Sequence, residues 1–214
     1  VYLLADDIFD EMVSRNVGEY RYPLGGKLYV FNKNENIGFI KGHMCSPAIA
    51  TQAEDLIAGG VKELIHVGYA GGLQPELVPG EIILTDGAFN DTAVARLYGY
   101  DYDIIHSSKD LTNEIESMIT SAEIPYKRGI HWTTDAGYRE TWGQVMDYRD
   151  KGALCVEMEG VGLFTIANYR KCVATGIYVV SDVYSENDWK LGWEGNDIKR
   201  AVGAVIDMII ESIR

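Results

Sequence analysis

The stretch 153–164, ALCVEMEGVGLF, places two glutamates inside a run that otherwise has the composition of a protein core. Residues 153–158 have the pattern of a strand and residues 159–169 that of a helix, so the acids mark a strand-to-helix junction. Glu157 and Glu159 are two positions apart and point to the same side of such a strand. Glutamate is rarely buried without a partner. The junction therefore predicts either a binding site or an ordinary helix-start acid at Glu159, where free N–H groups favour an anion.

Strand and helix patterns alternate on both sides of this junction. Short apolar alternations at 27–32 and 36–41 predict a hairpin, and a capping serine at Ser46 before Pro47 predicts a helix that ends at Gly59-Gly60. Several strands are almost continuously apolar, so we expect an α/β fold in one domain, 1–214, with a mixed sheet covered on both faces. The other expected strands are 62–68, 80–89, 126–135 and 173–182, and the other expected helices are 110–122, 139–149 and 198–213.

The composition argues against several classes of partner. The net charge of −13, from 19 Lys and Arg against 32 Asp and Glu, repels a polyanion, so we expect no nucleic-acid partner. No apolar run approaches the roughly twenty residues that span a bilayer, and no secretory pattern opens the chain, so we expect a cytoplasmic protein without a membrane partner. The cysteines, Cys45, Cys155 and Cys172, form no C-x-x-C pair, and the four histidines show no metal-ligand spacing. We expect neither disulfides nor a metal.

Polar residues and glycines gather where four of the expected strands end, at 68–72, 133–139, 157–159 and 181–182. In open α/β sheets, ligands bind beyond the carboxyl ends of the strands. Asp182 follows an apolar strand, and an aspartate kept dry in this way can hold a proton and donate it to a departing heterocyclic base. The competing interpretation makes Asp182 the N-cap of a short following turn. Ser181 stands beside it at the same strand end.

The strand ends at 68–72 and 133–139 offer other binding groups. The segment HVGYAGGL, 66–73, predicts a glycine turn whose backbone N–H groups at Ala70 and Gly71 face a ligand, or else a plain strand-to-loop turn. The segment TTDAGYRET, 133–141, offers Tyr138 for stacking and Arg139 for a planar acceptor. Arg139 can equally pair with Glu140 on a solvated helix start.

Four motifs together resemble the nucleoside phosphorylase superfamily, which includes purine nucleoside phosphorylases, uridine phosphorylases and methylthioadenosine/S-adenosylhomocysteine nucleosidases. The likeness runs from about residue 20 to the C-terminus, with the order of the motifs kept. It implies a three-layer αβα fold around a central mixed β-sheet, a homo-oligomer between dimer and hexamer, and cleavage of the N-glycosidic bond of a nucleoside. The motifs are VGYAGGLQPELVPGEIILTDGAFND at 67–91, WTTDAGYRET at 132–141, VEMEG at 156–160 and SDVYSENDW at 181–189.

The resemblance also implies roles for individual residues. Glu159 matches the glutamate that holds the ribose hydroxyls, Met158 the methionine against the sugar, and Glu157 the other acid of that motif. Asp182 matches the acid that protonates or hydrogen-bonds N7 of a purine, and Tyr138 falls in the base-binding segment. The implied reaction is phosphorolysis in purine salvage, with phosphate as co-substrate and no cofactor. Its transition state is oxocarbenium-like, so Glu159 would stabilise positive charge while Asp182 makes the base a better leaving group.

The phosphate-binding positions depart from the family pattern. Members carry Gly-Asp-Pro-x-Arg near the N-terminus, where this chain has ADDIFDEM at 5–12. His66 stands where many members have a second phosphate arginine, and Tyr69 where a small hydroxyl residue is usual. Arg21 matches an arginine lent to a neighbouring subunit's phosphate site, and Gly137 stands where an aromatic commonly stacks on the base. Two alternatives therefore stay open: phosphate-independent hydrolysis, and a nucleoside-binding protein that has lost catalysis.

Overall fold

The structure, a computed structural model, describes residues 1–22, 24–185, 188–192 and 195–213, so residues 186–187 of the motif at 181–189 lie outside it. No helix in these ranges is long and apolar enough to cross a membrane. The strands are β1 (Tyr2–Leu4), β2 (Gly18–Tyr22), β3 (Leu28–Phe31), β4 (Asn34–Lys41), β5 (Glu63–Gly72), β6 (Ile82–Asp91), β7 (Ile104–His106), β8 (Tyr126–Thr134), β9 (Cys155–Glu157), β10 (Val173–Ser185) and β11 (Asp188–Leu191). The helices are α1 (Asp6–Ser14), α2 (Ser46–Ala58), α3 (Val94–Leu97), α4 (Lys109–Ser121), the 3₁₀ turn η1 (Gly137–Arg139), α5 (Trp142–Asp150), α6 (Gly160–Arg170) and α7 (Asn196–Ser212).

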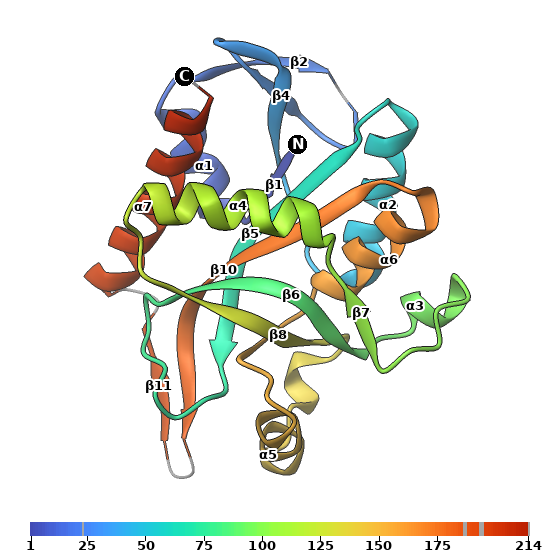
Figure 1. Cartoon of the computed structure of the whole chain (residues 1–214), viewed down its shortest axis with the longest axis vertical. Helices are drawn as coiled ribbons and strands as arrows, with labels where there is room; N and C mark the ends of the chain where they lie inside the picture. The colour runs from blue at the N-terminus through green and yellow to red at the C-terminus, as the bar shows by residue number, and fades with distance from the viewer. Residues whose placement is uncertain (23, 186–187, 193–194, 214) are drawn as a thin grey trace.

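One mixed sheet runs through the molecule (Figure 1). Its strands lie in the order β11-β10-β6-β8-β9-β5-β1-β4-β3-β2, and β7 pairs with β6. Because β10 pairs with both β5 and β6, the strands β5, β9, β8, β6 and β10 close into a ring, from which β1, β4, β3 and β2 extend. The expected hairpin is the antiparallel pair β3–β4. The expectation of a mixed sheet is confirmed, because β1 pairs in parallel with both β4 and β5.

Helices cover both faces of the sheet. One apolar cluster joins α1, α4 and α7 to the strands, and a second cluster holds α2, α3 and α6 against the other side. Figure 1 shows α2 and α6 side by side, away from α1 and α7. The repeat of Ile198, Val202, Val205 and Ile209 buries one stripe of α7 as its spacing predicts. The expected three-layer arrangement is confirmed.

The predicted glycine turn at 66–73 is wrong, because β5 continues through it to Gly72. Gly71 pairs with Asp182 of β10 on one side and with Val156 of β9 on the other. A Cβ at Gly71 would lie 3.0 Å from the Tyr184 ring. The glycines therefore allow three strands to approach closely, and the backbone groups that were expected to face a ligand are engaged in the sheet.

The predicted serine cap of α2 is also wrong. Cys45 is the N-cap residue, with φ of 71°, and Ser46 is the first residue of the helix. The Ser46 hydroxyl instead donates to the carbonyl of Met158 at 2.9 Å. This bond ties the start of α2 to the β9–α6 junction, and it brings α2 against α6 at Gly162.

Gly162→Ala is expected to destabilise the protein. An added Cβ would lie 2.5 Å from the Ser46 carbonyl oxygen and 2.8 Å from its Cα. Backbone cannot rotate away from such a clash, so the free energy of unfolding should fall by about 1–3 kcal/mol. The matched control is Gly203→Ala in α7, where nothing lies within 4 Å of the new atom. That change should stabilise by roughly 0.5–1 kcal/mol through helix propensity. Equal effects of both changes in urea unfolding would contradict this packing.

Candidate active site

A cavity of about 400 Å³ opens where β1, β4 and β9 end, beside the middle of β5. Residues from four segments line it, within 5–7, 42–44, 66–69 and 157–159. Because β1 and β4 are parallel neighbours, their carboxyl ends meet at one edge of the sheet, which is the expected position of a ligand site, while β5 runs on past it. The cavity brings together five of the residues predicted from the sequence, namely His66, Tyr69, Glu157, Met158 and Glu159.

Glu157 is a fully satisfied carboxylate at the rear of the cavity, 5% exposed. Its Oε1 accepts from His131 Nε2 at 3.0 Å and from the Thr133 hydroxyl, and its Oε2 accepts from the backbone N–H groups of Glu159 and Gly160 at 2.8 Å each. Burial alone would raise the pKa of Glu157, but the charge and hydrogen bond of His131 and the bond from Thr133 outweigh it and lower the pKa. Glu157 therefore caps α6 as a permanent anion.

Glu159 is the N-cap residue of α6, yet its side chain makes no capping bond. Its Oε1 accepts from the backbone N–H of Cys45 at 2.6 Å, and its Oε2 accepts from the N–H of Met158 at 3.3 Å. No lysine or arginine of the described ranges pairs with it. Burial and the neighbouring charge of Glu157 raise the pKa of Glu159 to about 8. The interpretation of Glu159 as an ordinary helix-start acid is not favoured, because Glu157 already accepts from the free N–H groups at the start of α6.

The acids of the described lining have no basic counterpart there. Asp6 and Asp7 join the two glutamates, and no lysine or arginine is among the described lining residues. The Tyr69 hydroxyl donates to Asp7 Oδ2 at 2.6 Å, and Lys41 at the rim pairs with Asp6 at 2.6 Å. Burial lowers the pKa of His66 to about 4, so its imidazole is neutral at pH 7. The cavity therefore carries negative potential.

One group of described residues has the composition of a metal site. His66, Glu157 and Glu159 each bring a ligand atom within 4.8 Å of the others, and His66 Nδ1 has no hydrogen-bond partner. Both oxygens of Glu157 already accept two hydrogen bonds each. Little lone-pair density is left for a cation, so this group is poorly suited to bind a metal.

Asp182 and Ser181 lie within β10 and do not line the cavity. Asp182 is 6% exposed, and its Oδ1 accepts from the Ser181 hydroxyl at 2.5 Å. A Cβ on Gly71 would stand 3.3 Å from Asp182 Oδ2, so this carboxylate faces β5. The alternative role of Asp182 as an N-cap is wrong, because the residue lies in the middle of a strand. Ala70 is buried in β5 and pairs with Val180.

Three predicted residues lie away from the cavity. Tyr138 and Arg139 in η1 are exposed, and the Glu140 carboxylate accepts from the Tyr184 hydroxyl. Arg21 is exposed on β2, where it pairs with Glu35 at 3.3 Å.

The structure adds lining residues that the sequence analysis did not single out as ligand contacts: Asp6, Asp7, His43 and Met44. His43 and Met44 directly follow β4, so the strand-end rule applied to 36–41 would have found them. The two aspartates follow β1, a three-residue strand that the sequence pattern does not reveal.

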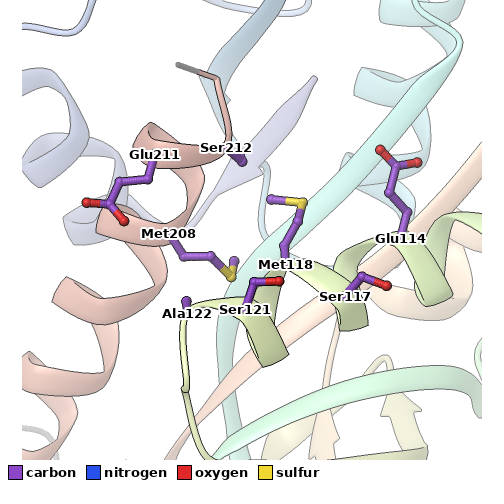
Figure 2. A pocket seen from close by; sticks show the side chains of 8 residues that line it. All are labelled: Glu114, Ser117, Met118, Ser121, Ala122, Met208, Glu211 and Ser212. Carbon is purple, nitrogen blue, oxygen red and sulfur yellow. The ribbon is translucent and has the colours of Figure 1, made fainter.

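A second cavity, of about 430 Å³, lies between α4 and α7 and shares no residue with the acidic one. Figure 2 shows Met118 and Met208 between the two helices, with Glu114 and Glu211 farther out. No two titratable groups converge in it, so we do not assign chemistry to this cavity.

Glu159→Gln is expected to stabilise the ligand-free protein most at high pH. The pKa of Glu159 is about 8 in the folded protein against an ordinary 4.5, so folding favours the protonated form. The stability that this proton contributes is complete below pH 4.5 and is lost as the pH rises through 8, whereas a neutral glutamine keeps it. Melting temperatures from pH 5 to 9 should show a widening gain over wild type, with the exposed Glu76→Gln as control. A gain that does not change with pH would contradict the buried position of Glu159.

Comparison with known proteins identifies the family of the chain. Residues 7–211 match the family described as Phosphorylase superfamily. A protein of Caldanaerobacter subterraneus subsp. tengcongensis named "Purine nucleoside phosphorylase DeoD-type" is 33% identical over 182 residues, which are 84% of this chain and 76% of that protein. A protein of the same name from Exiguobacterium sibiricum is 29% identical over 182 residues, with 84% and 75% covered.

A solved structure described as the P knowlesi homolog of P falciparum PNP superposes with a TM-score of 0.80. It covers 99% of this chain and 86% of its own, at 19% identity, so it shows the shared fold. With the family match across nearly the whole length and the strand-end cavity in place, the chain belongs to the phosphorylase superfamily.

Proposed function

We propose that the protein cleaves the N-glycosidic bond of a purine nucleoside and transfers the pentosyl group to inorganic phosphate, without a cofactor. The observation that carries this proposal is Glu159, a carboxylate at the cavity with no lysine or arginine partner in the described ranges. Two adjacent carboxylate oxygens are a good acceptor for two vicinal hydroxyls. The relatives named purine nucleoside phosphorylase, up to 33% identical among those compared, support the choice of reaction.

The mechanism assigns one task to each acid. As the bond between C1′ and N9 breaks, positive charge develops on the pentose. Glu159, whose pKa of about 8 means that it must first lose a proton, fixes the diol as a carboxylate and stabilises that charge. Met158, which lines the same cavity, packs against the sugar. Asp182 donates a proton or hydrogen bond to N7, so that the base leaves without a negative charge.

The acidic lining is the strongest argument against phosphate as the nucleophile. Four acidic side chains line the cavity, and His66, one of its two histidines, is neutral at pH 7. A dianion needs a cation here, and Arg21 of a second copy of the chain is our candidate, because it is exposed on the edge strand β2. A homo-oligomer then completes the site. The acidic lining favours hydrolysis as the second candidate function, with water in place of phosphate.

At pH 9, where Glu159 is ionised, Glu159→Gln should lower kcat/KM for purine nucleosides by about 100-fold or more, because charge-assisted bonds to two hydroxyls are lost. Asp182→Asn should lower kcat by roughly 10²–10⁴-fold, the usual contribution of a general acid. Both are measured by base release under saturating phosphate, with Glu76→Gln as the exposed control. Unchanged turnover in Glu159→Gln would show that the sugar site lies elsewhere.

Base release should depend on phosphate, and Arg21→Ala should raise the KM for phosphate roughly 10–100-fold, as expected for the loss of a charged hydrogen bond. Arg96→Ala, which removes an exposed arginine from α3, is the matched control. The two variants are compared at equal oligomeric state, measured by light scattering. If base release is as fast without phosphate as with it, hydrolysis replaces phosphorolysis.

A further inference from the structure

A second carboxylate lies close to Asp182, on the segment that joins η1 to α5. Glu140 is half-buried, and its Oε2 accepts from the Tyr184 hydroxyl at 2.8 Å. Its Oε1 has no donor in the described part of the chain. Burial and the charge of Asp182 raise the pKa of Glu140. The mechanism above leaves this carboxylate without a task.

Two glycines place Glu140 beside the proposed base position. A Cβ on Gly137 would lie 3.5 Å from Glu140 Oε1 and 3.7 Å from Met158 Sδ, so the free oxygen and the sulfur border the same small space. A Cβ on Gly71 would lie 3.0 Å from the Tyr184 ring and 3.3 Å from Asp182 Oδ2. Tyr184 therefore links the two acids. A purine base attached to a sugar that packs against Met158 would therefore lie beside both carboxyl groups.

We propose that Glu140 is a specificity-determining residue that selects 6-aminopurine nucleosides over 6-oxopurine nucleosides; this rests on the proposed function of the site. Asp182 donates to N7, as the mechanism above assigns, and the Glu140 carboxylate accepts from the adjacent exocyclic amino group. A 6-oxopurine presents two acceptors on that edge, so its carbonyl oxygen meets the bare carboxylate, which is unfavourable.

The test compares kcat/KM for adenosine and inosine in wild type, Glu140→Gln, Tyr184→Phe and the exposed control Glu76→Gln. Wild type should prefer adenosine by roughly 10–100-fold, the value of one hydrogen bond to a charged group. Glu140→Gln should reduce this preference at least tenfold, because a carboxamide can donate to a 6-oxo group. Tyr184→Phe leaves the Glu140 carboxylate in place but removes the hydrogen bond that positions it. The preference for adenosine over inosine should therefore become smaller. Glu76→Gln should match wild type.

A second measurement does not need turnover. Calorimetric titration of the wild-type protein with adenine and with hypoxanthine should show tighter binding of adenine. Equal kcat/KM of wild type for both nucleosides, or equal affinity for both bases, would overturn the inference. Loss of both activities by the same factor in Glu140→Gln would also overturn it, since that is the effect of a purely structural bond to Tyr184. Failure of the proposed function has a different signature, in which neither nucleoside releases base while adenine still binds more tightly.

Discussion

The geometry of the site depends on Glu157, whose two carboxylate oxygens each accept two hydrogen bonds. Four donors, from His131, Thr133 and two backbone N–H groups, fill both of its oxygens and fix the turn from β9 into α6. Because Glu157 satisfies the first N–H groups of the helix, Glu159 does not have to cap it. The second acid is thus turned toward the cavity, where only backbone donors hold it. A buried carboxylate held only by backbone donors lowers the stability of the folded protein, but it remains available to bind a ligand.

The β9–α6 junction is also held by residues at the start of α2. The Ser46 hydroxyl binds the carbonyl of Met158, and the N–H of Cys45 binds Glu159, so the start of α2 supports both flanks of the turn. Cys45 adopts a left-handed conformation to present that N–H. The packing of Gly162 on Ser46 keeps α2 and α6 in this register. Site geometry and helix packing are therefore coupled.

Sequence patterns predicted the α/β fold, the mixed sheet and most of the helices and strands, because apolar periodicity directly reflects burial. The same patterns identified Glu157 and Glu159, since polar residues at strand ends are conspicuous, whereas His66 and Tyr69 were found through the family resemblance. They missed β1, whose three residues are too few to show a period, and with it Asp6 and Asp7. They also took the glycines at 71–72 for a turn, because a sequence does not show the close approach of β10 and β9.

The central claim is that Glu159 grips the pentose through its vicinal diol. The direct test is calorimetric binding of a purine-like C-nucleoside, whose carbon–carbon glycosidic bond cannot be cleaved, and of its 2′,3′-dideoxy counterpart. Each hydroxyl that donates to a charged acceptor contributes about 1.5–3 kcal/mol. We therefore predict that, at pH 9 where Glu159 is ionised, removing both hydroxyls weakens binding by at least about 100-fold. Equal affinities for the two compounds would contradict the account.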